Sequence, residues 1–273
     1  MDKCNLLIDE EIFSFYVEGK FNWGDNKYLY DKHNNIISNA EWADEGFKVI
    51  DLFDGKEFRK LRDNINNTIY KIGIENDIDF PDNFDIEDYH SYIKDNDDHL
   101  KIINHTRELR DDDFDFDLSK ISKDISEIIG VDLTSYNSLL KRSHVQMRIN
   151  RPFSTDYNPP HKDAYLPYYE DVLNIWIPIC GCDKNSSLPL MPKSHLMNES
   201  SLYKSDCKSA KINNITYNVP CILKVKGDFK LIRPNPPLQK AIIFSPYLIH
   251  GAASNNNKDV TRVALELRLS RKK

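Results

Sequence analysis

The chain has 273 residues and is 40% hydrophobic and 11% aromatic, enough to bury one sizeable core, so we expect a single catalytic or binding domain over residues 1–273. A net charge of -6 and a pI near 5.8 argue against a nucleic-acid or anionic-membrane surface and favour a small-molecule partner. Residues 1–20 carry acids where a signal peptide is apolar, and no apolar run is long enough to span a membrane, so we expect a cytoplasmic protein; its oligomeric state is left open.

Residues 1–142 are expected to form a lead-in of strands and helices that packs on the rest of the chain. Residues 46–52 (GFKVIDL) predict a short strand, and residues 54–72 predict a helix. Asp54 and Glu57 have the spacing of a capping box, which satisfies the first free amides of a helix. Its apolar stripe consists of Phe58, Leu61, Ile65, Ile69 and Ile72.

A second helix is predicted over residues 118–129, with Gly130 as its stop. Its expected inward face consists of Ile121, Ile125, Ile128 and Ile129. The segment 76–117 between the two helices is rich in acids and histidines. A metal cluster is conceivable there, but a charge-rich run is more often a solvated helix face or a mobile loop, and we favour that interpretation.

From residue 143 onward, short apolar runs alternate with Pro, Gly and Asn turns, which is typical of a sandwich or barrel of strands. Successive side chains of a strand point to opposite faces, so each run has one apolar and one polar face. The polar faces carry His144, Gln146 and Arg148, then Asn174 and Trp176, and last Arg262, Glu266 and Arg268. We expect a mixed, mainly β fold whose apolar faces meet the helices and whose polar faces converge at a barrel mouth.

The stretch NPPHKDAYLP places His161 and Asp163 two residues apart, so in extended backbone both reach one point. His250 ends a distant apolar strand, just before a turn of small residues. Two histidines and one carboxylate leave open coordination positions and suit non-heme Fe(II). By chance alone about one His-x-acid match is expected in such a chain, so the doublet is weak by itself. Either histidine could instead be an ordinary turn or strand-end residue.

Arg262 follows on the polar face of the last strand, where a buried guanidinium needs a carboxylate partner. That partner could be Glu266 or a ligand. The order H161-x-D163, H250 and R262 resembles the iron(II)- and 2-oxoglutarate-dependent dioxygenases, closest to the phytanoyl-CoA dioxygenase-like branch. The resemblance extends to QMRINRP, NIWIPI, LPLMPKSHL and HGAASNN, although Lys193 stands where the family usually has glycine.

The resemblance implies a double-stranded β-helix, or jelly roll, over residues 143–273. It implies Fe(II) on His161, Asp163 and His250, with 2-oxoglutarate and O2 as co-substrates and succinate and CO2 as products. It further implies that Arg262 binds the distal carboxylate of 2-oxoglutarate, and that Gln146 and Trp176 line the co-substrate.

The expected substrate is a small polar metabolite or biosynthetic intermediate, such as a sugar, an amino-acid derivative or a natural-product precursor. Segments 76–117 and 198–237 match nothing in the family and are expected to set substrate preference. Candidate substrate residues are Tyr165, Tyr168, Arg148, His144 and Arg268, and the last three could instead pair with Glu266. Two alternatives remain, a jelly roll that binds a ligand without turnover and a cupin-like isomerase or hydrolase that uses another divalent metal.

Overall fold

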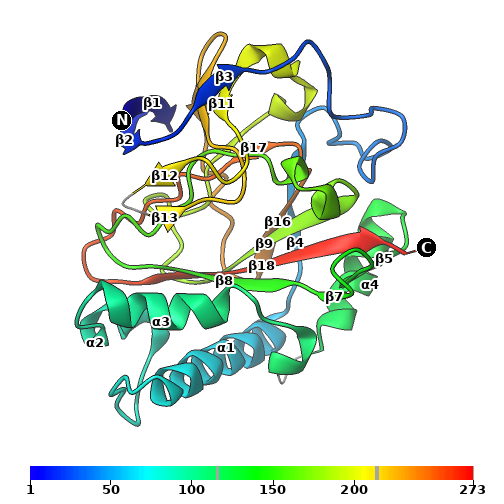
Figure 1. The fold of residues 1–273 in the computed structure, drawn as a ribbon. Helices are drawn as coiled ribbons and strands as arrows, with labels where there is room; N and C mark the ends of the chain where they lie inside the picture. Colours follow the sequence, from blue (N-terminus) through cyan, green and yellow to red (C-terminus); the bar gives the residue numbers. More distant parts are fainter. Residues whose placement is uncertain (115–116, 213–214, 273) are drawn as a thin grey trace.

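The computed structural model describes residues 1–114, 117–212 and 215–272. Its centre is a six-stranded sheet in the order β4-β16-β9-β18-β5, with β8 also paired to β18 (Figure 1). The strands of this sheet are β4 (Phe47–Asp51), β5 (Leu133–Thr134), β8 (Val145–Asn150), β9 (Val172–Cys180), β16 (Lys240–Phe244) and β18 (Arg262–Arg271). The order of the strands in the sheet differs from their order in the sequence, so residues distant in sequence become neighbours in this sheet.

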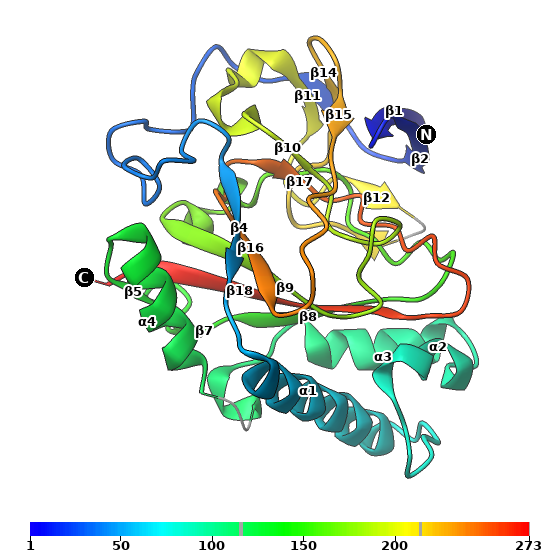
Figure 2. The ribbon, with the colours of Figure 1, turned by 180° about the vertical axis from the view of Figure 1, so that it is seen from behind.

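One face of the large sheet is covered by helices, as Figures 1 and 2 show from opposite sides. The helices are α1 (Gly55–Glu75), α2 (Tyr89–Tyr92), α3 (Asn96–Thr106) and α4 (Leu118–Ile129). A single apolar cluster joins the buried residues of α1, α3 and α4 to the apolar faces of β8, β9 and β18. Within the described ranges, no helix combines the length and the apolarity needed to cross a membrane.

The other side of the molecule is built from smaller sheets. Two of them have three strands: β15 (Lys230–Leu231), β1 (Asp2–Ile8) and β2 (Glu11–Val17) form one, and β14 (Ile222–Val225), β11 (Leu202–Ser205) and β3 (Phe21–Trp23) form the other. Two more have two strands each: β10 (Leu190–Met191) pairs with β17 (Ile249–His250), and β12 (Lys211–Ile212) pairs with β13 (Ile215–Thr216). A further pair is β6 (Tyr136–Asn137) with β7 (Arg142–Ser143). The fold is therefore mixed and mainly β, of the expected jelly-roll type, and the sheets of the described residues do not close into one barrel.

Six short 3-10 helices lie in the connections of the described chain. They are η1 (Ile86–Asp88), η2 (Asp111–Asp113), η3 (Asp163–Tyr165), η4 (Pro167–Tyr169), η5 (Ser194–Leu196) and η6 (Glu199–Ser201). Of these, η3 begins at the aspartate of the predicted metal doublet.

The first helix confirms its sequence prediction. Asp54 accepts hydrogen bonds from the amides of Lys56 and Glu57, each at 2.8 Å, and the Glu57 side chain accepts from the Asp54 amide at 3.2 Å. All five residues of the predicted stripe are buried. Both the start of α1 and the face that it turns to the sheet thus follow from local sequence.

The fourth helix corrects one prediction. It ends at Gly130, whose φ of 71° is the left-handed cap expected there, and Ile121 and Ile125 are buried. Ile128, however, is 44% exposed. Ile128 lies on the same face of the helix as Ile121 and Ile125, but in the last turn. Helical periodicity predicts the direction in which a side chain points, but it does not predict whether the core extends that far.

The two segments expected to set substrate preference, 76–117 and 198–237, have definite structure in their described parts. Residues 115–116 and 213–214, which belong to them, lie outside the described residues. Segment 76–117 contributes α3, which packs against β8 and buries His99, Ile102, Ile103 and Thr106. Of its acids, Asp97 and Asp98 lie in the first turn of α3, where Asp97 is exposed, and Asp85 forms an ion pair with Arg62 of α1.

Candidate active site

His161 and His250 come from distant segments that the backbone brings into register. The amide of His161 donates to the carbonyl of His250 at 2.9 Å, and the amide of His250 donates back at 3.0 Å. Directly paired residues of antiparallel strands carry their side chains on the same face. The two imidazole rings accordingly lie with centroids 4.4 Å apart.

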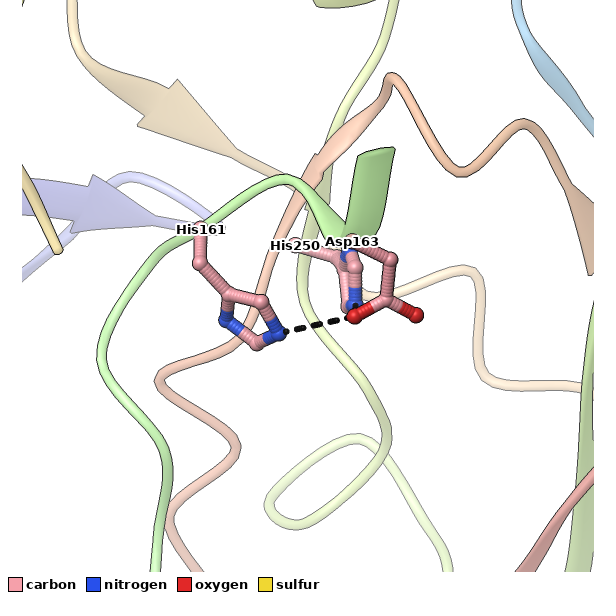
Figure 3. A group of neighbouring side chains, drawn as sticks. All are labelled: His161, Asp163 and His250. Atoms are coloured by element: carbon pink, nitrogen blue, oxygen red, sulfur yellow. Dashed lines mark ion pairs between the residues drawn. The ribbon is translucent and has the colours of Figure 1, made fainter. Parts of the chain in front are cut away.

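Asp163 completes the group from the first turn of η3. Its Oδ1 lies 3.4 Å from Nε2 of His161 and 3.9 Å from Nε2 of His250. In Figure 3 the three side chains point toward one another, with the dashed line joining His161 and Asp163. The predicted projection of His161 and Asp163 to one side is confirmed, because the backbone stays extended through Lys162 before it turns.

Hydrogen bonds at the outer ring atoms fix the tautomer of both histidines. Nδ1 of His161 lies 2.7 Å from the carbonyl of Pro159, and Nδ1 of His250 lies 3.0 Å from the carbonyl of Leu248. A carbonyl oxygen can only accept, so each Nδ1 carries the proton and each Nε2 presents a lone pair. Burial, assisted by the nearby His161, lowers the pKa of His250 to about 4, which keeps that imidazole neutral.

The second oxygen of Asp163 is held by the surrounding protein. Oδ2 accepts from Nδ2 of Asn174 and from Nε of Arg268, each at 3.0 Å, and Nη2 of Arg268 forms an ion pair with it at 2.9 Å. Burial alone would raise the pKa of Asp163, but the Arg268 guanidinium holds it well below its usual range. The carboxylate is therefore ionised, and its Oδ1 remains directed at the two imidazoles.

These donors fit a divalent metal ion. Two lone pairs and one anionic oxygen converge within 4.8 Å of one another, and all three residues are buried. Without a cation, these three electron-rich atoms would be buried facing one another with no positive charge or hydrogen to bind. No other group of three or more such ligands occurs among the residues that the structure describes. Two histidines and a carboxylate on one side leave positions for further ligands, the arrangement used by non-heme iron.

Arg262 lies on the same inward face of β18 as Arg268 but meets different groups. Its side chain is buried, Nη2 donates to the carbonyl of Ala253 at 3.0 Å, and Nε has no partner in the described structure. Burial lowers the pKa of Arg262 because the desolvated cation has little compensation. An orphaned guanidinium N–H at this place fits an incoming carboxylate, as the distal end of 2-oxoglutarate would supply.

His161, His250 and Arg262 line one cavity of about 250 Å³. Its remaining wall comes from α3, from β8, from the loop before His161 and from the 198–237 segment. The wall residues from segments 76–117 and 198–237 are Asn96, His99, Leu100, Ile103 and Arg107 in the first and Ile215 and Tyr217 in the second. Both segments therefore border the space in which a substrate would meet the metal.

Comparison with known proteins decides the family. The phytanoyl-CoA dioxygenase family model matches residues 43–235, more than half of the chain. The chain belongs to this family. It is accordingly an enzyme of the Fe(II)- and 2-oxoglutarate-dependent dioxygenase type, with iron, 2-oxoglutarate and O2 as its cofactor and co-substrates. The match spans residues 76–117 and 198–235, so the expectation that these segments match nothing in the family is wrong. It ends before His250 and Arg262, so the roles of those two residues rest on geometry.

Several solved structures are similar to the chain at low identity. EctD from S. alaskensis with 2-oxoglutarate and 5-hydroxyectoine has 13% identity and a TM-score of 0.48, covering 94% of this chain and 84% of that chain. AviO1 from Streptomyces viridochromogenes Tue57 has 14% identity and a TM-score of 0.44, covering 83% and 90%. The epimerase SnoN with Fe3+, alpha ketoglutarate and nogalamycin RO has 11% identity and a TM-score of 0.40, covering 85% and 81%. No curated protein matches the chain.

Two residues to which the family resemblance assigned co-substrate contacts have different surroundings. Gln146 uses its carbonyl oxygen to accept from Arg148 and Arg268, each at 3.0 Å, and its amide donates to the carbonyl of Arg107 at 3.0 Å. Trp176 is fully buried in the apolar cluster inside the jelly roll, and its Nε1 has no partner in the described structure. Gln146 thus belongs to a polar network, whereas the indole N–H is free to donate.

The candidate substrate residues separate into distinct places. Tyr165 donates to Glu199 at 2.9 Å, away from the metal ligands, and Tyr168 packs edge-on against Tyr169 with centroids 4.5 Å apart. His144 also contacts Tyr169 through a hydrogen bond and a stacked ring. In contrast, Arg148 lines the cavity and donates to Glu266 at 2.9 Å. This is the ion pair with Glu266 that was the alternative to a substrate contact.

Some residues of the site were not recognised from sequence. Asn174, which holds the aspartate, lay on the inward face of a predicted strand, so strand parity was an available signal. Lys162 lies between the metal ligands and, by parity, faces away from them into a buried environment that requires an acid. Arg107 and Tyr217 carried no signal, since only the tertiary fold brings their segments to the cavity.

Proposed function

We propose that this member of the phytanoyl-CoA dioxygenase family hydroxylates a small polar metabolite or biosynthetic intermediate, such as a sugar, an amino-acid derivative or a natural-product precursor. Fe(II) would be held by Nε2 of His161, Oδ1 of Asp163 and Nε2 of His250. The observation that carries the proposal is the convergence of these three atoms, with every outer hydrogen-bonding position of the ligands already used by the protein.

Arg262 is proposed to bind the distal carboxylate of 2-oxoglutarate, and Trp176 is proposed to line the same co-substrate. The unpartnered Nε of Arg262 and the unpartnered indole N–H of Trp176 support this assignment. When bound, iron supplies the oxidation chemistry with O2 and 2-oxoglutarate, and succinate and CO2 are released. The protein supplies the ligand geometry, a buried cation for the co-substrate and a cavity that limits access of water.

We also propose that residues 1–273 act as one catalytic domain, with residues 1–142 packed on a core of residues 143–273. The main apolar cluster contains residues of both parts, including Leu61 of α1 and Leu265 of β18. The first strands of the chain also extend sheets of the core, since β1 pairs with β15 and β3 pairs with β11.

The test is anaerobic loading of the protein with Fe(II) and 2-oxoglutarate, followed by oxygen and a screen of small polar metabolites for stimulated succinate release. We expect one Fe(II) per chain and substrate-dependent succinate. A protein that binds metabolites without releasing succinate would contradict turnover, and turnover without 2-oxoglutarate would contradict the oxygenase assignment.

The ligand assignment has its own variants. His161→Ala, Asp163→Ala and His250→Ala should each abolish succinate release and lower bound iron, because each removes one of three ligands. Asp163→Glu should also be damaging, since the extra methylene displaces the oxygen by more than metal–ligand distances tolerate. Iron content and succinate are measured together. Wild-type turnover in any one of these variants would show that the residue is not an essential ligand.

A further inference from the structure

Arg107 is the residue that follows α3, and its side chain lines the cavity that also contains His161 and His250. Two hydrogen bonds fix its backbone there. The carbonyl of Arg107 accepts from Nε2 of His144 at 3.1 Å and from Nε2 of Gln146 at 3.0 Å. The end of α3 is thereby attached to β8, and this attachment sets where the guanidinium can reach.

The guanidinium of Arg107 has no ion-pair or hydrogen-bond partner anywhere in the described structure. The other arginines around the site are paired. Arg148 meets Glu266, Arg151 meets Asp156 through bonds of 2.8 and 2.9 Å, and Arg268 meets Asp163. Arg262, which we assign to 2-oxoglutarate, at least donates to a backbone carbonyl. Arg107 is thus a cavity cation without an ion-pair partner among the described residues.

Such a placement costs stability and therefore calls for a ligand. Burial lowers the pKa of Arg107, and the nearby positive charge of Arg148 lowers it further, while Tyr217 and Asp156 raise it by less. A cation at a helix C-terminus can be favourable through the helix dipole. The Arg107 guanidinium, however, makes no hydrogen bond to the last carbonyls of α3 in the described structure, and it lines a cavity shared with the metal ligands.

We propose that Arg107 binds a carboxylate of the substrate and so selects small organic acids, an inference that rests on the proposed oxygenase function. A guanidinium offers two parallel N–H groups that match the two oxygens of a carboxylate. One unpaired unit charge suits a monoanion better than a phosphate dianion. Leu100, Ile103 and Met147 supply apolar wall beside it, which suits the hydrocarbon part of such an acid. The substrate would then span from Arg107 to the metal.

The test measures binding of acids against neutral analogues of the same shape. The holoenzyme is kept anaerobic with Fe(II) and saturating 2-oxoglutarate, so that Arg262 is occupied. Benzoate and benzamide, hexanoate and hexanamide, and inorganic phosphate are titrated by calorimetry. The proteins are the wild type, Arg107→Met, Arg107→Lys and the control Lys101→Met, which removes one exposed charge from the same helix.

We expect the wild type to prefer at least one acid over its amide by about tenfold to a hundredfold, the value of a charge-assisted hydrogen bond. Arg107→Met should abolish the preference, Arg107→Lys should keep part of it, and Lys101→Met should keep all of it. No preference in the wild type, or a preference that survives Arg107→Met, would overturn the proposal. Phosphate binding that depends on Arg107, with no carboxylate binding, would overturn the carboxylate assignment.

Two further measurements separate this inference from its alternatives. The melting temperature of Arg107→Met should equal or exceed that of the wild type, because no partner is lost, and a fall of several degrees would assign Arg107 a structural role instead. Affinity for 2-oxoglutarate, followed by the metal-to-ligand absorption band, should be unchanged in Arg107→Met. Absence of that band in the wild type would count against the oxygenase function itself.

Discussion

Arg262 and Arg268 occupy the same face of β18, and sequence spacing alone could not assign their partners. In the structure Arg268 donates to Asp163, whereas the Nε of Arg262 is orphaned at the cavity. The guanidinium of Arg268 therefore orients Asp163, whereas that of Arg262, six residues earlier on the same strand, is available to a co-substrate. The difference is accessible to paired substitutions.

We expect Arg262→Lys to weaken 2-oxoglutarate binding by on the order of 2–4 kcal/mol, or roughly thirtyfold to several hundredfold, with iron binding nearly intact. Arg268→Lys should instead lower iron affinity by about tenfold to a hundredfold, because Asp163 loses the hydrogen bond from Nε and the close approach of the guanidinium. Titrations of iron and of 2-oxoglutarate into both variants measure the two effects. If Arg268→Lys lost 2-oxoglutarate affinity while Arg262→Lys kept it, the two roles would be reversed.

Two buried histidines outside the metal group make stability depend on pH. Burial lowers the pKa of His99 and of His144 to about 4, although Asp156 lies 3.4 Å from His99. In the unfolded chain these groups regain a pKa of about 6.5. The unfolded state therefore binds protons first as pH falls, so stability is fully present above about pH 6.5 and is lost down to about pH 4.

We expect each of these histidines to remove on the order of 2 kcal/mol of unfolding free energy between about pH 6.5 and about pH 5. Urea unfolding at about pH 7.5 and about pH 5 measures the loss. His99→Gln should reduce the pH dependence while keeping a polar side chain near Tyr89. An equally steep dependence in His99→Gln and His144→Gln would show that other groups control acid sensitivity.

At the scale of elements, η6 is fastened to the loop that carries the metal doublet. Lys162, between the two ligands, pairs with Glu199 of η6 at 2.9 Å, and the two side chains are 1% and 0% exposed. Glu199 also accepts from Tyr165 at 2.9 Å and lies 3.1 Å from Lys204. The 198–237 segment thereby supports the loop that carries His161 and Asp163 from the side opposite their side chains.

Breaking this buried pair should be costly. Glu199→Gln is expected to lower the unfolding free energy by about 3–5 kcal/mol, since Lys162 would remain buried without its counterion. The double variant Lys162→Met with Glu199→Leu should recover much of the loss. Urea unfolding provides the measurement, with Glu45→Gln in the exposed Lys193 pair as a control expected to cost less than about 1 kcal/mol. A loss no larger than in the control would refute the fastening role.

At the scale of the whole molecule, the site exists because two distant chain segments approach closely at Gly251. This residue has a φ of 124°, and a Cβ there would lie 2.6 Å from the carbonyl of Pro159. The neighbouring amide of Ala252 donates to the carbonyl of Asn158 at 2.7 Å. The pairing of His161 with His250 therefore requires a residue without a side chain directly after the second histidine.

Gly251→Ala should reduce both stability and iron affinity, because the added methyl group separates the segments that align the ligands. Gly227→Ala is the matched control. Gly227 also has a left-handed φ, of 99°, but a Cβ there would meet nothing within 4 Å, so only backbone strain of about 1–2 kcal/mol is expected. Thermal unfolding and iron titration distinguish the two. Equal iron affinity in the two variants would argue against the close-approach explanation.

Local sequence was sufficient for the elements whose causes are local. The capping box at Asp54, the buried stripe of α1 and the left-handed stop at Gly130 all have the predicted form, because capping and periodicity depend on residues within one or two turns. The strand faces of β8, β9 and β18 followed from alternation in the same way. Ile128 differed because the end of a core is not a local property.

Through its resemblance to the dioxygenase family, the sequence by itself indicated the type of fold and the iron and 2-oxoglutarate chemistry, while strand parity and residue type indicated the residues proposed to hold the metal. Only the tertiary structure decided that Arg268 orients Asp163, that Tyr165 binds Glu199, and that Arg107 and Tyr217 border the cavity. Parity fixes the side of a strand to which a residue points, whereas its partner there depends on which distant segment the fold brings to that side.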